Sequence, residues 1–338
     1  MKKVSLKEIA GLAGVSASTV SLILNGKARE MRISSALEKK VTSLARKSGY
    51  HPNQLAISLR TGKSQILGLI VESISGHFFA ALAKVIEDEA ERHGYRVLYC
   101  STENDPVKGA ELLRMLTQRK VDGFLITPTK GMEQEVAKLF EEKQPMVLID
   151  SYFPGLKVPS VMVDNYEGVT KGMNYLLAKG YSKIAFVTID IPLEQLGLRQ
   201  KAYSDALRKK HITVSKKRIL QVPFSNTQEQ TIKAIASFMK AQPDLDAVFF
   251  ATNYLGIAGL ESIGLLNLSI PSDIAIVSFD DEDIFRLFPP GISAIRQPIE
   301  AIAKTAMELL MKQINNKKSI QHHPPVQITA DFIQRGSA

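Results

Sequence analysis

The chain has 338 residues, which suits two or three domains rather than one. Hydrophobic residues make up 45% and charged residues 23%, the balance of a soluble globular protein, and strand-sized apolar stretches such as residues 66–71 exclude a membrane span. We expect no signal peptide, because Lys7 and Glu8 interrupt the amino terminus before an apolar segment can form. Cys100 is the only cysteine, so no internal disulfide can form and a cytoplasmic location is favoured.

The net charge of +9 is concentrated at the amino terminus. Residues 1–63 contain twelve Lys or Arg and three acidic residues, whereas the rest of the chain contains 31 of each kind. A short basic segment joined to a neutral body is typical of a nucleic-acid-binding head. A basic tail that only aids solubility would not carry the apolar pattern described next.

The first fifty residues carry the pattern of three short helices. Apolar residues recur at helical spacing over residues 6–13, and Gly14 follows where a left-handed residue ends a helix. Ser16 is a candidate N-cap of a second helix that ends at Asn25, and a third helix is expected over residues 34–47. Two short helices joined by a tight turn, with a third as support, predict a helix-turn-helix whose second helix enters the DNA major groove.

From residue 64 onward, strand-like apolar runs alternate with amphipathic helical stretches. Two series of such runs cover residues 66–71, 95–100, 122–127 and 145–150, and then 183–188, 218–223, 246–252 and 273–279. Strands that are apolar throughout indicate parallel sheets covered on both faces. The two series predict two similar α/β lobes, each a doubly wound parallel sheet. A further strand-like run lies near the end, over residues 326–333.

Two segments carry a specific resemblance to a known family. The runs VSLKEIAGLAGVSASTVSLILNG and GYHPNQLAISLRTGKS, with the spacing between them, resemble the head and hinge of the lactose/galactose repressor (LacI/GalR) family. The resemblance extends to the end of the chain. It implies an all-α helix-turn-helix head over residues 1–50, a hinge helix and linker over 51–63, and a two-lobed periplasmic-binding-protein-like domain over 64–338. The implied boundaries are about 64–161 and 292–320 for lobe 1, and about 162–291 and 321–338 for lobe 2.

The resemblance also assigns DNA contacts to the second helix of the head. Bases are read by Ala17 and Ser18, at the start of that helix, and by Leu22. The family usually has an arginine at the position of Leu22, and an exposed leucine offers only apolar contact, for example to a thymine methyl group. The family's backbone contacts correspond to Thr19, Ser21 and Asn25.

The hinge is expected to act in the minor groove. The matching residues are Asn53, Ala56 and Leu59, and Leu59 corresponds to the leucine that wedges between central base pairs. The alternative is a small core stripe of Leu55 and Leu59, but the isolated segment has no core to join. The implied partner is a near-palindromic operator in double-stranded DNA, which a homodimer would match.

Ligands of doubly wound sheets bind at loops beyond the carboxyl ends of the strands. Together with the family's motifs, this rule gives eight candidate effector-binding residues: Phe78, Phe79, Asp150, Arg199, Phe224, Asn253, Asp280 and Gln297. An acid, an arginine, amides and an aromatic ring suit a polyol, so we expect a sugar or sugar derivative. Two alternatives stay open: an inter-lobe salt bridge formed by an arginine and an aspartate of this set, with no ligand role, and a core role for Phe78 or Phe79, of which one is expected to face the cleft.

No catalytic, cofactor or metal site is expected. The dinucleotide and phosphate loop motifs are absent, no Gly-x-Ser-x-Gly elbow occurs, and the six histidines are scattered. A ligand-controlled repressor is therefore favoured over a solute-binding protein, which would have no use for a helix-turn-helix, and over an enzyme with a DNA-binding head. The sequence leaves open whether the effector is a hexose, a pentose, a sugar phosphate or a nucleobase, and whether it acts as inducer or co-repressor.

Overall fold

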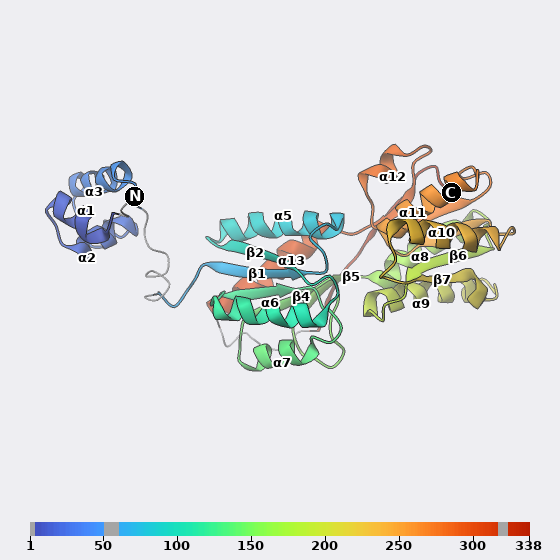
Figure 1. The fold of residues 1–338 in the computed structure, drawn as a ribbon, viewed down its shortest axis with the longest axis horizontal. Helices are drawn as coiled ribbons and strands as arrows, with labels where there is room; N and C mark the ends of the chain where they lie inside the picture. Colours follow the sequence, from blue (N-terminus) through green and yellow to red (C-terminus); the bar gives the residue numbers. More distant parts are fainter. Residues whose placement is uncertain (1–3, 51–60, 317–323) are drawn as a thin grey trace. The chain divides into compact units, whose positions relative to one another are not determined.

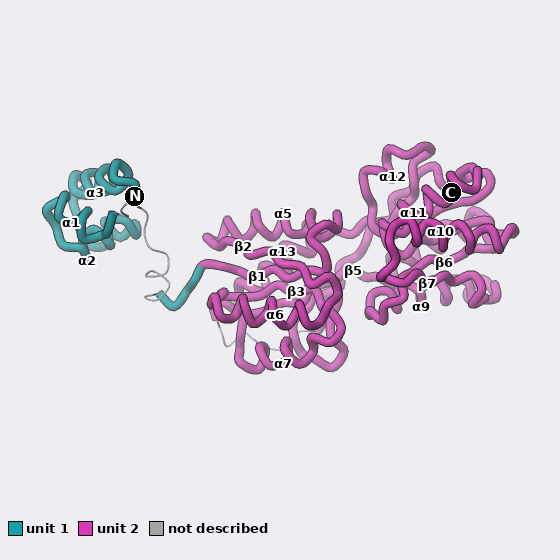
Figure 2. Tube along the Cα trace, viewed as in Figure 1, with its two compact units in different colours: residues 1–64 teal, residues 65–338 magenta. Residues whose placement is uncertain are grey.

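The computed structural model describes residues 4–50, 61–316 and 324–338. The chain divides into two units, residues 1–64 and residues 65–338 (Figure 2), close to the expected end of the linker. The proposed hinge residues Asn53, Ala56 and Leu59 lie outside the described residues, so their minor-groove role stays a prediction.

The smaller unit contains the three expected helices, α1 (Leu6–Ala13), α2 (Ala17–Leu24) and α3 (Ser35–Lys47). Gly14 ends α1 with a left-handed φ of 74°, and the Ser16 hydroxyl accepts the Thr19 N–H at 3.1 Å to cap α2. The pair α1 and α2 is bent by 102°, and the apolar faces of the three helices form a small core around Ile9, Val20 and Val41. No single helix among the described residues is long and apolar enough to cross a membrane, although the bent pair α1 and α2 meets that test by length and composition.

The larger unit contains two six-stranded sheets. The first has the order β11 (Val326–Ile328), β5 (Ser160–Val163), β4 (Met146–Ile149), β3 (Gly123–Ile126), β1 (Ile66–Val71) and β2 (Arg96–Ser101). The second has the corresponding order β12 (Asp331–Ile333), β10 (Ser293–Arg296), β9 (Ala275–Phe279), β8 (Ala247–Phe250), β6 (Ile184–Ile189) and β7 (Ile219–Val222). All neighbouring strands are parallel except β12, which is antiparallel to β10. The prediction of two doubly wound sheets is confirmed.

Helices cover both faces of each sheet, which explains why the strands are apolar throughout (Figure 1). In lobe 1, Leu69 of β1 belongs to the core with α5 (His77–Arg92) and α13 (Ile299–Asn315). The next residue, Ile70, belongs to the core with α6 (Pro106–Gln118) and α7 (Glu133–Glu141) on the opposite face. The remaining helices are α8 (Asn165–Ala178), α9 (Glu194–Lys209), α10 (Gln228–Lys240), α11 (Asn253–Leu265), the short α12 (Asp283–Leu287) and a 3-10 turn at Lys216–Arg218.

Lobe 2 repeats this arrangement. Phe186 of β6 belongs to the core with α8 and α9, and the neighbouring Val187 belongs to the core with α10 and α11. In both lobes, successive residues of the central strand point to opposite helical layers, as the twofold periodicity of a strand requires. The carboxyl ends of the parallel strands therefore form one edge in each lobe, and these edges carry the site described below.

The chain crosses between the lobes somewhat later than the approximate boundaries that the resemblance implies. Residues 162–163 continue β5 in the first sheet, β10 belongs to the second sheet, and β11 belongs to the first. The run 326–333 is not one strand, because β11 joins one sheet and β12 the other. Strands of three or four residues carry no sequence signal for their pairing partner, which is chosen by tertiary contacts.

Candidate functional site

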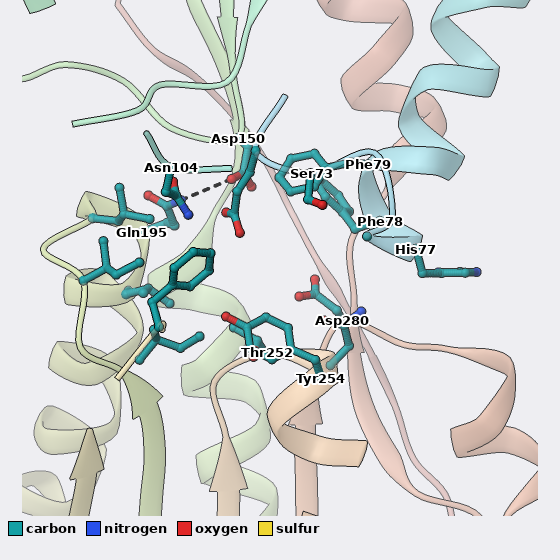
Figure 3. A pocket seen from close by; sticks show the side chains of 18 of the residues that line it. Ser73, His77, Phe78, Phe79, Asn104, Asp150, Gln195, Thr252, Tyr254 and Asp280 are labelled. Carbon is teal, nitrogen blue, oxygen red and sulfur yellow. Dashed lines mark hydrogen bonds between the residues drawn. The ribbon is translucent and has the colours of Figure 1, made fainter. Parts of the chain in front are cut away.

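A cavity of about 510 Å³ lies between the two lobes, beyond the carboxyl ends of the strands (Figure 3). All eight candidate effector-binding residues line this cavity. Asp150 directly follows β4, Asp280 follows β9 and Gln297 follows β10, whereas Arg199 lies on α9. The rule that places ligands at the ends of parallel strands thus brings together residues that lie far apart in the sequence.

Arg199 is the most constrained side chain of the cleft. It is 3% exposed, its Nε donates to Asn165 Oδ1 at 2.8 Å, and its Nη1 donates to the Ala251 carbonyl at 2.6 Å. The guanidinium also stacks 3.5 Å from the centre of the Phe279 ring. Burial lowers the pKa of Arg199, and the charges of Asp280 and Asp150 oppose that shift. The arginine therefore holds lobe 2 together as well as facing the cleft.

Asp150 and Asp280 occupy corresponding places in the two lobes, one residue beyond β4 and β9. Both have a left-handed backbone, with φ of 69° and 68°, which aspartate tolerates better than most residues and which is common at functional sites. Asp280 accepts from Gln297 Nε2 at 2.6 Å and lies 3.9 Å from Arg199 Nη1. Arg199 and Asp280 come from the same lobe, so the ion pair between them does not connect the lobes.

Hydrogen bonds between side chains of the described residues connect the two lobes. Gln195 Nε2, on α9 of lobe 2, donates to Asp150 Oδ2 of lobe 1 at 3.2 Å (Figure 3). Tyr152, in the loop after β4, donates its hydroxyl proton to Glu194 Oε1 at 3.5 Å. A ligand that contacts Asp150 would therefore either replace its hydrogen bond from Gln195 or add a further contact between the lobes.

Both phenylalanines of the α5 amino terminus line the cavity, with ring centroids 5.1 Å apart and the planes at 70°. Phe78 is 9% exposed and belongs to the core under α5, whereas Phe79 is only partly buried. Phe224, beyond β7, is 40% exposed. The rings available to a ligand are therefore those of Phe79 and Phe224 more than that of Phe78.

Several cleft residues were not found from the sequence. The acidic and amide side chains among them are Glu72, Glu103, Asn104, Gln195 and Glu282. Glu72 directly follows β1, so the rule that selected Asp150 would have selected it. Burial, together with a smaller contribution from the nearby Asp150 charge, raises the pKa of Glu72 to about 7. Burial likewise raises the pKa of Asp150 to about 6, although Arg199 opposes the shift.

The candidate DNA-reading residues lie on or next to α2. Ser18 and Asn25 are exposed, whereas Ala17 packs partly against the core of the head. Leu22 is half-buried, so the expectation of an exposed leucine is only partly met. The Thr19 and Ser16 hydroxyl oxygens lie 2.8 Å apart, and Asn25 Nδ2 donates to the Ser21 carbonyl at 2.6 Å. Four of the six proposed contact residues are thus polar, and they lie on α2 or directly after it.

A three-helix head with a helix-turn-helix, joined to a two-lobed unit with a polar cleft, is the architecture of a DNA-binding transcriptional regulator. Residues 5–53 match the family described as bacterial regulatory proteins, lacI family, and residues 173–338 match a periplasmic binding protein-like domain. The HTH-type transcriptional regulator KdgR of Bacillus subtilis is 31% identical over 338 residues, covering 98% of this chain and 97% of KdgR. The chain belongs to the LacI family of bacterial transcriptional regulators, and its relatives are regulators rather than enzymes.

Solved structures agree with this assignment. The lac repressor dimer bound to operator and the anti-inducer ONPF matches the fold with a TM-score of 0.87 at 18% identity, covering 99% of both chains. A periplasmic binding protein/LacI transcriptional regulator from Alkaliphilus metalliredigens, complexed with D-xylulofuranose, is 27% identical with a TM-score of 0.70. It covers 81% of this chain and 98% of the solved one.

Proposed function

We propose that this protein is a transcriptional repressor in the cytoplasm that binds a near-palindromic operator as a homodimer and is controlled by a sugar or sugar derivative in the cleft. One observation carries the proposal: a single chain combines a head that matches the lacI family with a cavity lined by all eight residues expected to bind an effector. The complex of a 27% identical relative with D-xylulofuranose supports a sugar as the ligand class.

Ligand control requires that the effector binds two conformations with different affinity. The cleft offers such a difference, because Asp150 and Phe79 belong to lobe 1 whereas Arg199 and Asp280 belong to lobe 2. An effector that contacts both sets would favour one relative orientation of the lobes. In a dimer, that orientation would set the spacing of the two hinges, and with it the affinity for the operator.

The test begins with DNA. In vitro selection with the full chain should recover near-palindromic sites, and fluorescence anisotropy should then give the operator affinity with and without each member of a sugar and nucleobase library. Ser18→Ala should change the preferred half-site, because Ser18 is exposed at the start of α2, whereas Ser35→Ala at the start of α3 should not. Recovery of no preferred sequence would contradict the DNA-binding function.

The second arm concerns the ligand. A library member that raises the melting temperature should also change operator affinity, and Asp280→Asn should abolish both effects while leaving ligand-free operator binding intact. Light scattering should give a dimer. If no ligand of any class altered operator binding although the protein bound its operator, the effector part of the proposal would fail and the DNA-binding part would stand.

A further inference from the structure

The charge balance of the cleft is strongly acidic. Five acidic side chains line the cavity: Glu72, Glu103, Asp150, Asp280 and Glu282. Among the described residues that line it, only Arg199 and His77 can carry positive charge. Arg199 is already engaged by protein acceptors, and His77 interacts with Asp280, at the end of the cavity away from Asp150 (Figure 3).

Four of these acids accept a hydrogen bond from a neighbouring side chain. Asp280 accepts from Gln297 and Asp150 accepts from Gln195, both from amide groups. Glu282 accepts from the Asn253 amide, and Glu103 accepts from Ser101 at 2.8 Å. Glu72 and Asp150 both belong to lobe 1, where they directly follow β1 and β4, and the charge of Asp150 raises the pKa of Glu72. Arg199 lowers the pKa of Asp150, in opposition to the effect of burial.

Two of the free hydrogen-bonding groups of the cleft are amide oxygens, and the buried Asn104 Nδ2 and Thr252 hydroxyl also lack a partner. Gln195 is 7% exposed, its amide nitrogen is committed to Asp150, and its Oε1 is buried without a partner. Gln297 is 6% exposed and shows the same pattern, because its nitrogen is committed to Asp280 and its Oε1 has no partner. A buried carbonyl oxygen without a donor destabilises the folded state, so we expect a ligand to donate hydrogen bonds to both oxygens.

We propose that the cleft selects an amine-bearing polyol, such as an amino sugar, whose ammonium group lies between Glu72 and Asp150 and whose hydroxyls donate to Gln195 and Gln297. This inference rests on the proposed function and narrows its ligand class. It disfavours sugar phosphates and sugar acids, because their anionic oxygens would face two carboxylates and two carbonyl oxygens with no unengaged cation beside them.

A metal ion is the other occupant that an acidic cleft could hold. Within the parts of the chain that the structure describes, no group of three or more His, Cys, Asp or Glu side chains is arranged to hold one. An ammonium group needs fewer ligands than a metal ion and donates three hydrogen bonds in flexible directions, as the lysine ammonium does. Two carboxylates and the nearby Gln195 oxygen can supply these acceptors.

The experiment uses matched trios of compounds with the full-length protein: a neutral hexose, its 2-amino-2-deoxy analogue and its 6-phosphate, in the glucose, galactose and mannose series. Thermal shift identifies binding, and calorimetric titration gives the affinity. In at least one series, the amino sugar should bind at least tenfold more tightly than the neutral sugar, and the phosphate should not bind. Glu72→Gln keeps the shape of the side chain and removes its charge. This variant should lose the tenfold preference for the amino sugar, since a charged hydrogen bond adds about 1.4 kcal/mol or more. Its affinity for the neutral sugar should change by less than about threefold.

Asp150→Asn provides a second variant should Glu72→Gln not fold, and Glu111→Gln, exposed on α6 outside the cavity, is the matched control that should leave every affinity unchanged. The proposal is overturned if a phosphate or acid sugar binds as tightly as the amine, if no amine binds, or if the preference survives in the folded charge-removal variants. A sugar phosphate that binds and changes operator affinity would refute this inference while supporting the proposed function.

Discussion

Replacing Arg199 by alanine should lower the free energy of unfolding of the larger unit, because Arg199 has a structural role in addition to its proposed ligand role. The substitution leaves the Asn165 and Ala251 oxygens without their donor and removes the cation that lowers the pKa of Asp150 and Asp280. Breaking a buried charged pair by removing one partner costs about 3–5 kcal/mol, and Arg199 is 3% exposed, so solvent screening is small. At about 2–4 °C per kcal/mol for a unit of this size, the melting temperature should fall by about 6–20 °C.

The assay is thermal unfolding of the full chain, followed by calorimetry at several pH values. The matched control is Arg208→Ala on the same helix, whose side chain is 65% exposed and pairs with Asp205 at 2.9 Å; it should cost less than about 1 kcal/mol. Loss of Arg199 should raise the pKa of Asp150 above its value of about 6, because Arg199 lowers that pKa. The stability difference between the variant and the parent should therefore narrow as the pH falls toward about 6, where protonation of Asp150 in the variant removes its uncompensated charge. Equal melting temperatures for Arg199→Ala and Arg208→Ala would refute the structural role.

Three further outcomes are expected. Ser16→Ala should destabilise the head by about 1 kcal/mol, because α2 loses its N-cap; an unchanged denaturation midpoint and operator affinity would count against it. The folded state raises the pKa of Glu72 to about 7, so it binds more protons than the unfolded chain between about pH 4.5 and 7, and stability should fall as pH rises through this range. Glu72→Gln should flatten that slope in a plot of melting temperature against pH, and a parallel curve would contradict the assignment. Leu59→Ala should weaken binding to the selected operator far more than binding to random DNA, and equal losses on both would refute the wedge.

Local features of this protein could be read directly from the sequence. The bond from Thr19 N–H to the Ser16 hydroxyl closes over three residues, and the end of α1 depends on the backbone freedom of Gly14 alone. Such interactions need no distant partner, so the bounds of the head helices followed from residue type and spacing. The apolar runs predicted the longer strands for a similar reason, since a strand buried on both faces must be apolar at every position.

The candidate site was predictable to the extent that it obeys a positional rule. Asp150 was found because it follows a recognisable strand, whereas Asp280 both follows such a strand and matches a motif of the resembled family. Glu72 satisfies the same positional rule. The protonation state of these residues was not predictable, because the pKa of Glu72 depends on burial and on the carboxylate of Asp150, 78 positions away in the sequence. Likewise, the division between Phe78 in the core and Phe79 at the cleft depends on how α5 packs on its sheet.

Only the tertiary structure decided which sheet receives each short strand and how the lobes contact one another. β10 and β11 have three or four residues each, and their pairing is chosen by edges built from distant parts of the chain. The Gln195–Asp150 bond joins residues 45 positions apart, and the Arg199–Ala251 bond joins residues 52 apart. Local sequence patterns encode periodicity and caps. The Arg199–Ala251 contact exists only once lobe 2 has folded, and the Gln195–Asp150 contact only once both lobes have folded and placed the strand ends together.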